Sequence, residues 1–133
     1  MEDLIMIGYP TGICDEYNNK PIIRKGISAT HIKNNFEGKS EFLIDMACFP
    51  GSSGSPVFAL IDKMNVENNT ISWGKRLFFV GVLHAGPQHT VVGEVRQVTG
   101  IQTVAQIPNN LGCVVKASEL KVLENILYKK ILV

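Results

Sequence analysis

The sequence predicts an all-β fold, an antiparallel sandwich or small barrel, followed by one C-terminal helix. Short segments rich in apolar and β-branched residues recur at close spacing, with turn residues between them. Only the last segment has apolar positions three to four residues apart. The 133 residues, 45% of them hydrophobic and 19% charged, are enough for one compact domain with its own core.

Three strands are expected in the first part of the chain. Residues 4–7 form an apolar run that stops at a Gly-Tyr-Pro loop. Residues 21–32 are rich in β-branched side chains, and Gly26 within them indicates a bulge or a barrel corner. Residues 41–45 predict the third strand, which leads directly into a stretch of glycine and serine.

The middle of the chain predicts further strands joined by two tight turns. Residues 56–61 are apolar, and residues 65–70 have the polar composition of a hairpin tip. Residues 71–73 and 77–83 are strand-like segments on either side of a second expected turn at Gly74-Lys75. We therefore expect five or six short strands in total.

The C-terminal segment predicts an amphipathic helix over about residues 118–131. Ser118 can cap its first turn. The apolar positions that recur at helical spacing are Leu120, Leu123, Ile126, Leu127 and Ile131. We expect this stripe to pack on the β-structure rather than to bind a partner.

Composition and charge exclude several classes of function. Thirteen basic and twelve acidic residues leave a net charge of +1 without a dense basic run, so nucleic acid is not an expected partner. Neither a signal peptide nor a membrane-spanning apolar stretch is visible. The three cysteines are widely spaced and odd in number, which favours a reducing, cytoplasmic location over a disulfide-linked secreted domain.

The stretch Gly51-Ser52-Ser53-Gly54-Ser55-Pro56 carries the most specific chemical signal. Glycine and serine at this density are also typical of linkers, but here they lie between two apolar strands, where a flexible joint would interrupt the core. A nucleophilic serine needs an exposed hydroxyl, a base and N–H donors for the oxyanion. Gly51 can adopt a positive φ, so its N–H and that of Ser53 can point into one pocket.

This stretch resembles the Gly-Asp-Ser-Gly-Gly-Pro signature of the chymotrypsin/trypsin superfamily. It is closer still to the Gly-x-Ser-Gly-Ser-Pro form of bacterial trypsin-like and glutamyl-specific serine peptidases. The resemblance implies that residues 1–133 form the second, C-terminal six-stranded β-barrel of such an enzyme. Ser53 is then the nucleophile, and the N–H groups of Gly51 and Ser53 form the oxyanion hole. Ser52 occupies the position at which trypsin has an acidic residue. The buried ion pair that forms when the trypsin zymogen is activated therefore cannot form here.

The resemblance extends to other segments. Asp45 matches an aspartate ahead of the serine in similar bacterial peptidases, and residues 7–10 and 23–26 resemble the opening strands of their second barrel. Residues 81–86 resemble a wall of the primary specificity pocket, which assigns substrate contacts to His84, Ala85 and Gly86.

The pocket floor would involve Ala47 and Cys48, so no carboxylate awaits a basic side chain. Similar glutamyl-specific enzymes carry a histidine on the wall strand that recognises an acidic side chain. His84 could have that role, or it could be an ordinary packed or surface histidine. Cys48 as a nucleophile is a further possibility, although no glycine donor lies two residues before it and an inert buried thiol is commoner.

The triad histidine and aspartate of the superfamily come from the first barrel, upstream of every matched segment. His31, His84 and His89 all lie in segments that match the second barrel. We therefore expect the chain alone to be inactive, and peptide or protein substrates to be cleaved only with a His- and Asp-bearing half or partner chain. The alternative is a non-catalytic peptide- or protein-binding module with the same fold.

Two further expectations concern ligands and association. His84 and His89 could join a cysteine at a metal ion, but no Cys-x-x-Cys or His-x-x-x-His spacing supports this, so neither a metal nor another cofactor is expected. An isolated second barrel would expose the face that meets the first one, which predicts some self-association.

Overall fold

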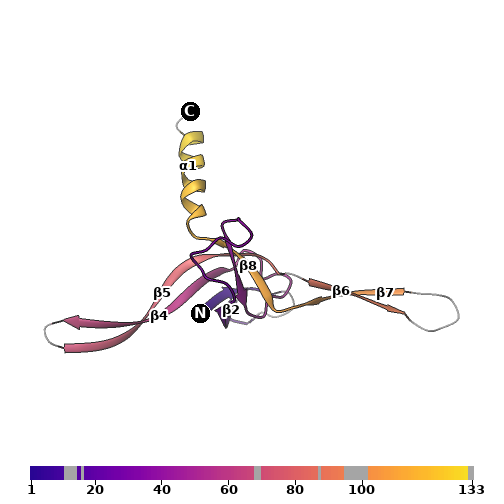
Figure 1. The fold of residues 1–133 in the computed structure, drawn as a ribbon, viewed down its shortest axis with the longest axis horizontal. Coiled ribbons are helices and arrows are strands. Elements are labelled where there is room, and N and C mark those ends of the chain that lie inside the picture. The colour runs from indigo at the N-terminus through magenta and orange to yellow at the C-terminus, as the bar shows by residue number, and fades with distance from the viewer. Residues whose placement is uncertain (11–14, 16, 68–69, 87, 95–101, 132–133) are drawn as a thin grey trace.

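The computed structural model describes residues 1–10, 15, 17–67, 70–86, 88–94 and 102–131, and within them the chain forms eight strands and one helix (Figure 1). The elements are β1 (Asp3–Gly8), β2 (Ile22–Ser28), β3 (Glu41–Asp45), β4 (Pro56–Glu67), β5 (Thr70–Ala85), β6 (Gln88–Glu94), β7 (Gln102–Pro108), β8 (Leu111–Lys116) and α1 (Glu119–Ile131). Six strands close into an antiparallel barrel in the order β1-β2-β3-β8-β5-β4. The prediction of a six-stranded antiparallel barrel with a C-terminal helix is confirmed, and the sandwich alternative is not.

The barrel core comes from the alternation of side chains along its strands. In β1 and β3 every second residue points inward, so Leu4, Phe42 and Ile44 are completely buried. The other members of this core are Met6, Met46, Cys48, Val57, Ala59, Leu83 and Val114. Burying one such large side chain stabilises the fold by about 1.5–3 kcal/mol.

Of the two roles predicted for Gly26, the bulge is wrong, and the strand pairing leaves the barrel corner untested. β2 keeps its register with β1 through Gly26, which lies opposite Leu4. A Cβ at this position would lie 2.4 Å from the carbonyl oxygen of Asp45, which is a severe clash. The glycine therefore allows β3 to approach β2 closely, while the pairing with β1 stays regular.

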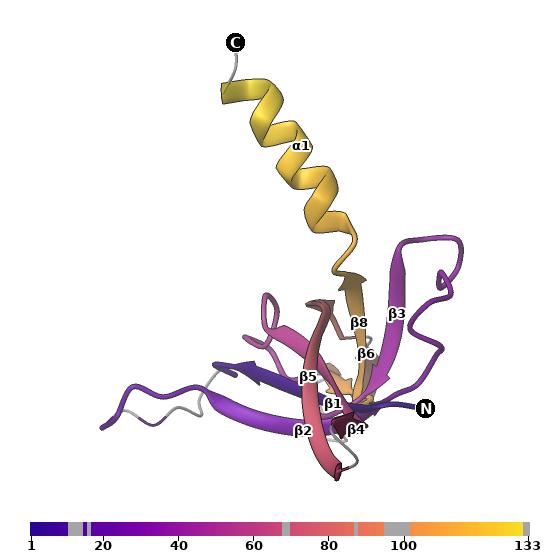
Figure 2. The same ribbon diagram turned by 90° about the vertical axis from the view of Figure 1, so that its left-hand side faces the viewer.

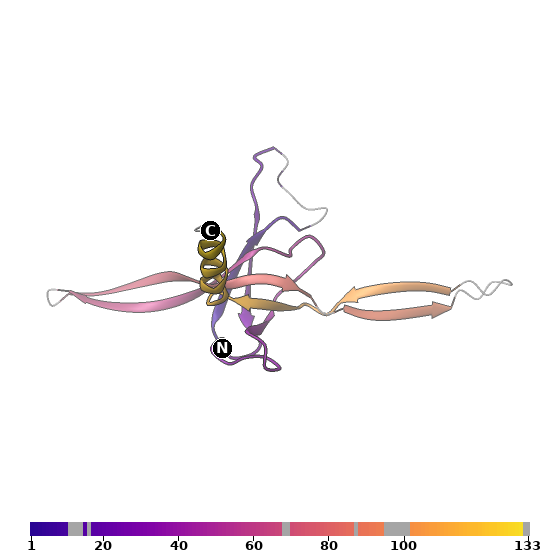
Figure 3. The same cartoon turned by 90° about the horizontal axis from the view of Figure 1, so that it is seen from above.

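The predicted turn at Gly74-Lys75 is wrong, because β5 runs without interruption from Thr70 to Ala85. Gly74 pairs with Lys63 and Lys75 with Asp62, so β4 and β5 form one long ribbon that extends away from the barrel (Figure 3). On such a solvated ribbon polar residues occupy strand positions, and a cross-strand pair of opposite charge suits the ladder. The hairpin tip predicted over residues 65–70 is shorter in the structure, because β4 extends to Glu67 and β5 begins at Thr70.

A second hairpin, β6–β7, has no counterpart in the sequence prediction. Its two strands pair antiparallel from Gln88–Pro108 to Glu94–Gln102 and belong to a sheet separate from the barrel. It extends from the barrel on the side opposite the β4–β5 ribbon (Figures 1 and 3). The β-branched residues of both strands, such as Thr90-Val91-Val92, were a usable signal.

The helix is predicted correctly, but its packing is not. α1 starts directly after Ser118, whose carbonyl oxygen accepts the Lys121 N–H at 3.2 Å. None of its residues is buried, and it extends away from the barrel (Figure 2). The stripe of apolar residues on α1 is therefore exposed rather than packed on the β-structure. Within the described ranges, no helix has the length and apolarity to cross a membrane.

Candidate active site

The segment that follows Cys48 begins with a tight β-turn. The N–H of Ser52 donates to the carbonyl oxygen of Phe49 at 3.0 Å. Pro50 occupies the second position and Gly51 the third, with φ of +84°. A type II turn needs a positive φ at its third position and favours proline at its second, so this dipeptide accounts for the turn locally.

A second turn of the same kind follows directly and presents Ser53. The N–H of Ser55 donates to the carbonyl oxygen of Ser52 at 3.1 Å, and Gly54 has φ of +89°. The three serines differ in exposure: Ser52 and Ser55 are 1% and 5% exposed, whereas Ser53 is exposed. The double turn thus places one serine at the surface between two buried ones.

The second turn is fixed to β5 by two backbone hydrogen bonds. The N–H of Gly54 donates to the carbonyl oxygen of Leu83 at 2.7 Å, and the N–H of Leu83 donates to that of Ser55 at 2.9 Å. Leu83 itself is buried in the barrel core. The structure therefore brings the predicted nucleophile turn directly beside the strand predicted to form a pocket wall.

Two amide donors remain available at this turn. In the part of the chain that the structure describes, the N–H groups of Gly51 and Ser53 donate to no protein acceptor. Both residues are exposed. Unused backbone donors held by a rigid turn are the elements of an oxyanion site.

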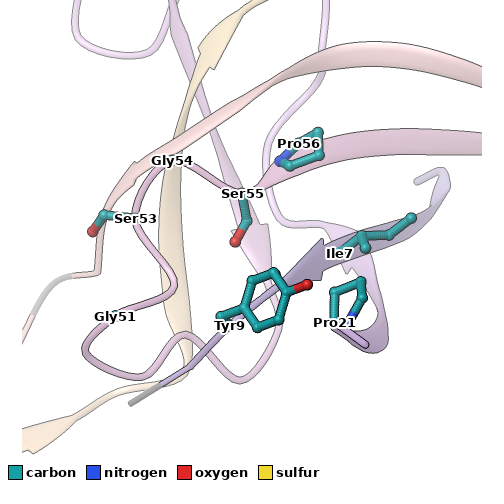
Figure 4. A pocket seen from close by; sticks show the side chains of 9 residues that line it. Ile7, Tyr9, Pro21, Gly51, Ser53, Gly54, Ser55 and Pro56 are labelled. Carbon is teal, nitrogen blue, oxygen red and sulfur yellow. The ribbon is translucent and has the colours of Figure 1, made fainter. Parts of the chain in front are cut away.

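A pocket of about 400 Å³ lies against the double turn (Figure 4). It is lined by Ile7, Gly8, Tyr9, Pro21, Gly51, Ser53, Gly54, Ser55 and Pro56. In Figure 4 the Ser55 side chain points toward Tyr9, whereas the Ser53 hydroxyl points away from them. The hydroxyl of Ser53 therefore lies at the rim of this pocket and the hydroxyl of Ser55 faces its interior.

Gly8 allows the turn to sit against the end of β1. A Cβ on Gly8 would lie 1.9 Å from the Ser55 hydroxyl oxygen, so a larger residue would force the Ser55 side chain to move. The sequence alone predicts only that Gly8, Tyr9 and Pro21 belong to loops and strands. The Gly-Tyr-Pro sequence at a strand end marked an irregular segment, but no local pattern placed it beside a serine more than forty residues away.

The residues predicted for the specificity pocket do not form the pocket that lies against the double turn. A Cβ on Gly86 would lie 3.5 Å from the Cβ of Cys48, so these two predicted positions are neighbours. The pocket of Figure 4 is not lined by Cys48, Gly86, Ala47 or His84. The side chain of Ala85 lies outside the described side chains, and its backbone pairs with Cys113.

Arg24 on β2 anchors the segment that leads into the double turn. Its guanidinium donates a hydrogen bond to the carbonyl oxygen of Ala47. The same group lies over the ring of Phe49, 4.9 Å from the centroid, in cation–π geometry. Phe49 accepts the hydrogen bond that closes the first turn, so Arg24 supports this turn from a strand 23 residues earlier. Nothing in the local sequence indicated this role.

His84 is the extra residue of a β-bulge. The pairing of β5 with β8 shifts from Leu83 opposite Val114 to Ala85 opposite Cys113. Leu83 points into the core, and His84 is exposed. The structure places His84 at the surface beside the double turn, and its role in recognising an acidic side chain stays a prediction.

No base contacts Ser53 in the described part of the chain. The Nδ1 atom of His31 accepts the N–H of Lys33 at 3.2 Å, within its own turn. No hydrogen bond joins either His31 or His84 to Ser53, and the side chain of His89 lies outside the described side chains. An unassisted serine hydroxyl is a weak nucleophile.

The described residues give no support to the two other chemical alternatives, which are a Cys48 nucleophile and a metal site. Burial raises the pKa of the Cys48 thiol to about 11, although nearby Arg24 partly offsets the effect, so the thiol is protonated at neutral pH. Burial also raises the pKa of Cys113. Among the described residues, no group of histidine, cysteine, aspartate and glutamate side chains has the arrangement of a metal site.

Comparisons with protein-family models, with curated proteins and with solved structures found no match to this chain. The function must therefore be inferred from the chemistry of the double turn and its surroundings. Those surroundings are the exposed Ser53, the two unused amide donors and the adjacent pocket.

Proposed function

We propose that this chain is the nucleophile-bearing half of a trypsin-like serine endopeptidase of the bacterial type. The observation that carries the proposal is the double turn. In it Ser53 is exposed, Gly51 has a positive φ, and the N–H groups of Gly51 and Ser53 have no acceptor in the described part of the chain. A serine hydroxyl beside preorganised amide donors is the arrangement that acyl transfer requires. The general base is supplied by a separate half that carries the histidine and the aspartate.

The reaction proceeds by covalent catalysis. The Ser53 oxygen bonds to the scissile carbonyl carbon while its proton passes to the imidazole of the other half. The N–H groups of Gly51 and Ser53 donate to the oxyanion that forms. The imidazolium then protonates the leaving amine, the C–N bond breaks, and water hydrolyses the acyl-enzyme by the same route.

The pocket against the double turn suits an uncharged substrate side chain, and recognition of an acidic side chain by His84 outside this pocket stays a separate prediction. The residues that line the adjacent pocket include no carboxylate, lysine, arginine or histidine, and Ile7, Pro21 and Pro56 offer apolar surface. The neighbouring Cys48 and Gly86 likewise provide no carboxylate for a lysine or arginine side chain. These surroundings favour apolar or small side chains near the scissile bond.

A second candidate is a peptide-binding module that uses the same pocket without chemistry. It is favoured by one observation: in the described part of the chain no base contacts Ser53. The two candidates differ in what Ser53→Ala does. The module predicts unchanged peptide affinity and no covalent reactivity, whereas the peptidase half predicts that Ser53 becomes reactive once a base is supplied.

Fluorophosphonate labelling with added imidazole tests the proposal on the isolated chain. We expect slow labelling alone and faster labelling as imidazole supplies the base, by about 10–10²-fold. Ser53→Ala should abolish the labelling. Ser52→Ala, at a neighbouring serine that is buried and does not line the pocket, should retain it.

Two results would decide against the proposal. Labelling of the untreated chain at the rate of a working protease would contradict the absence of a base. Labelling whose rate does not depend on imidazole, or that persists in the Ser53→Ala variant, would show that Ser53 is not the nucleophile. The binding module would then be the better explanation.

A further inference from the structure

α1 is a helix that the barrel does not stabilise. It has 13 residues, none of them buried. Helices of fewer than about 12–15 residues are marginal in water, and most gain their stability by packing an apolar face. Within the described part of the chain nothing packs on this face, so a molecule that covered it would stabilise the helix.

The uncovered face is continuous and apolar. Leu120, Leu123, Leu127 and Ile131 are between 48% and 77% exposed and lie at spacings of three and four along the helix. With Glu124 and Tyr128 they line a shallow groove of about 380 Å³. We call these six residues the α1 groove.

The total surface of the chain is large for its mass. The chain exposes 9915 Å². A compact monomer of 14.6 kDa is expected to expose only about 6,900 Å². The two hairpins that extend from the barrel account for part of this excess of roughly 3,000 Å², and the uncovered face of α1 accounts for another part.

The charges beside the groove select a second α1 in antiparallel orientation. Eleven residues make about three helical turns, so Glu119 and Lys130 lie on one flank of the groove and about 16 Å apart, while Glu124 lies on the other flank. In an antiparallel pair each flank faces itself, so Glu119 of one copy meets Lys130 of the other, twice. In a parallel pair the unlike flanks meet, and Glu119 faces Glu124.

We propose that α1 is a self-association element, which pairs antiparallel with α1 of a second copy through the α1 groove. Leu120 of one copy then lies at the level of Ile131 of the other, and two Glu119–Lys130 pairs close the ends. Two helices of 13 residues bury less than the ~1,200 Å² typical of tight interfaces, so the dimer forms in the micromolar range. This inference is independent of the proposed peptidase role.

Light scattering on the whole chain tests the element. We expect the mass to rise from 14.6 kDa toward twice that value between about 1 and 200 µM, with helical circular dichroism rising in parallel. Leu127→Asp should weaken self-association at least tenfold. Val122→Asp, the matched change on the opposite face of the helix, should leave it within about twofold. A chain that stays monomeric at 200 µM would overturn the inference, as would equal effects of the two variants.

Disulfide cross-linking tests the orientation, in a chain with Cys14→Ser and Cys113→Ser. Glu119→Cys with Lys130→Cys should give a covalent dimer on mild oxidation, because each cysteine meets its counterpart only in an antiparallel pair. Glu119→Cys with Glu124→Cys should not, since that pair meets only in a parallel dimer. Neither pair can close within one helix, where the Cα atoms are more than the 7 Å limit apart. The opposite pattern, or no dimer from either, would overturn the orientation.

Discussion

The double turn around Ser53 and the helix α1 are both at the surface, but they depend on the barrel to different degrees. The double turn is closed by two internal hydrogen bonds and joined to Leu83 by two more, and Ser52 and Ser55 are buried within it. α1 has no buried residue. The barrel therefore fixes the conformation of the proposed catalytic segment by itself, whereas the helix would gain stability from a molecule that covered it.

Shortening one leucine beside the double turn and one in α1 tests this difference most directly. Leu83→Ala removes a core side chain that is 2% exposed, so we expect a loss of about 2–5 kcal/mol in the free energy of unfolding. Leu127→Ala removes an exposed side chain of α1 and should change the monomer by less than about 0.5 kcal/mol. Urea denaturation at low micromolar concentration measures both. Similar losses would mean that α1 packs within the monomer.

Gly51→Ala tests whether the turn conformation carries the reactivity. A φ of +84° suits glycine, and alanine there costs about 1–2 kcal/mol or shifts the turn. If the Gly51 N–H moves away from the oxyanion, imidazole-stimulated labelling of Ser53 should fall by about 10²–10³-fold.

The control for Gly51→Ala is Gly38→Ala. Gly38 also has a positive φ, of +76°, and its Cβ would meet nothing within 4 Å, but it lies in another turn. It should cost similar stability and leave labelling unchanged. Equal losses of labelling in both variants would show that the effect is general destabilisation.

Arg24→Met tests the support that β2 gives to the first turn. The change removes the hydrogen bond to Ala47 and the contact with Phe49. We expect about tenfold slower labelling of Ser53, since each contact contributes roughly 1 kcal/mol. Arg76→Met, on the exposed ribbon, is the control and should have no effect. Unchanged labelling in Arg24→Met would mean that the turn holds its shape without β2.

Ser52→Ala should have the smallest effect of the series. The Ser52 hydroxyl is buried and has no hydrogen-bond partner among the described residues. Replacing an unpaired buried hydroxyl by a hydrogen atom should leave the free energy of unfolding within about 1 kcal/mol of its original value, with the change in the direction of a gain. A thermal melt measures this, and a loss well above that value would show that the hydroxyl has a partner.

The sequence predicted the features whose causes are local. The third strand ends where expected because its alternation and the following Pro50-Gly51 turn are both encoded within a few residues. The helix bounds follow from the periodicity of the leucines. The conformations of Gly51 and Gly54 likewise follow from the turn types their neighbours allow.

The features that the sequence could not give depend on distant contacts. Strand pairing overrode the turn composition of Gly74-Lys75, because residues of β4 complete the ladder. The amphipathic pattern of α1 indicates that its apolar face packs against another surface. It does not indicate which surface that is. The contact of Arg24 with Phe49 joins residues 25 positions apart, which no local pattern encodes.

The most direct test of the central claim is a crystal structure of the chain after fluorophosphonate labelling in imidazole. We predict a phosphorus atom bonded to the Ser53 oxygen, with the phosphoryl oxygen about 2.7–3.1 Å from the backbone nitrogens of both Gly51 and Ser53. A label on any other residue would contradict the claim. So would a phosphoryl oxygen that points away from both amides.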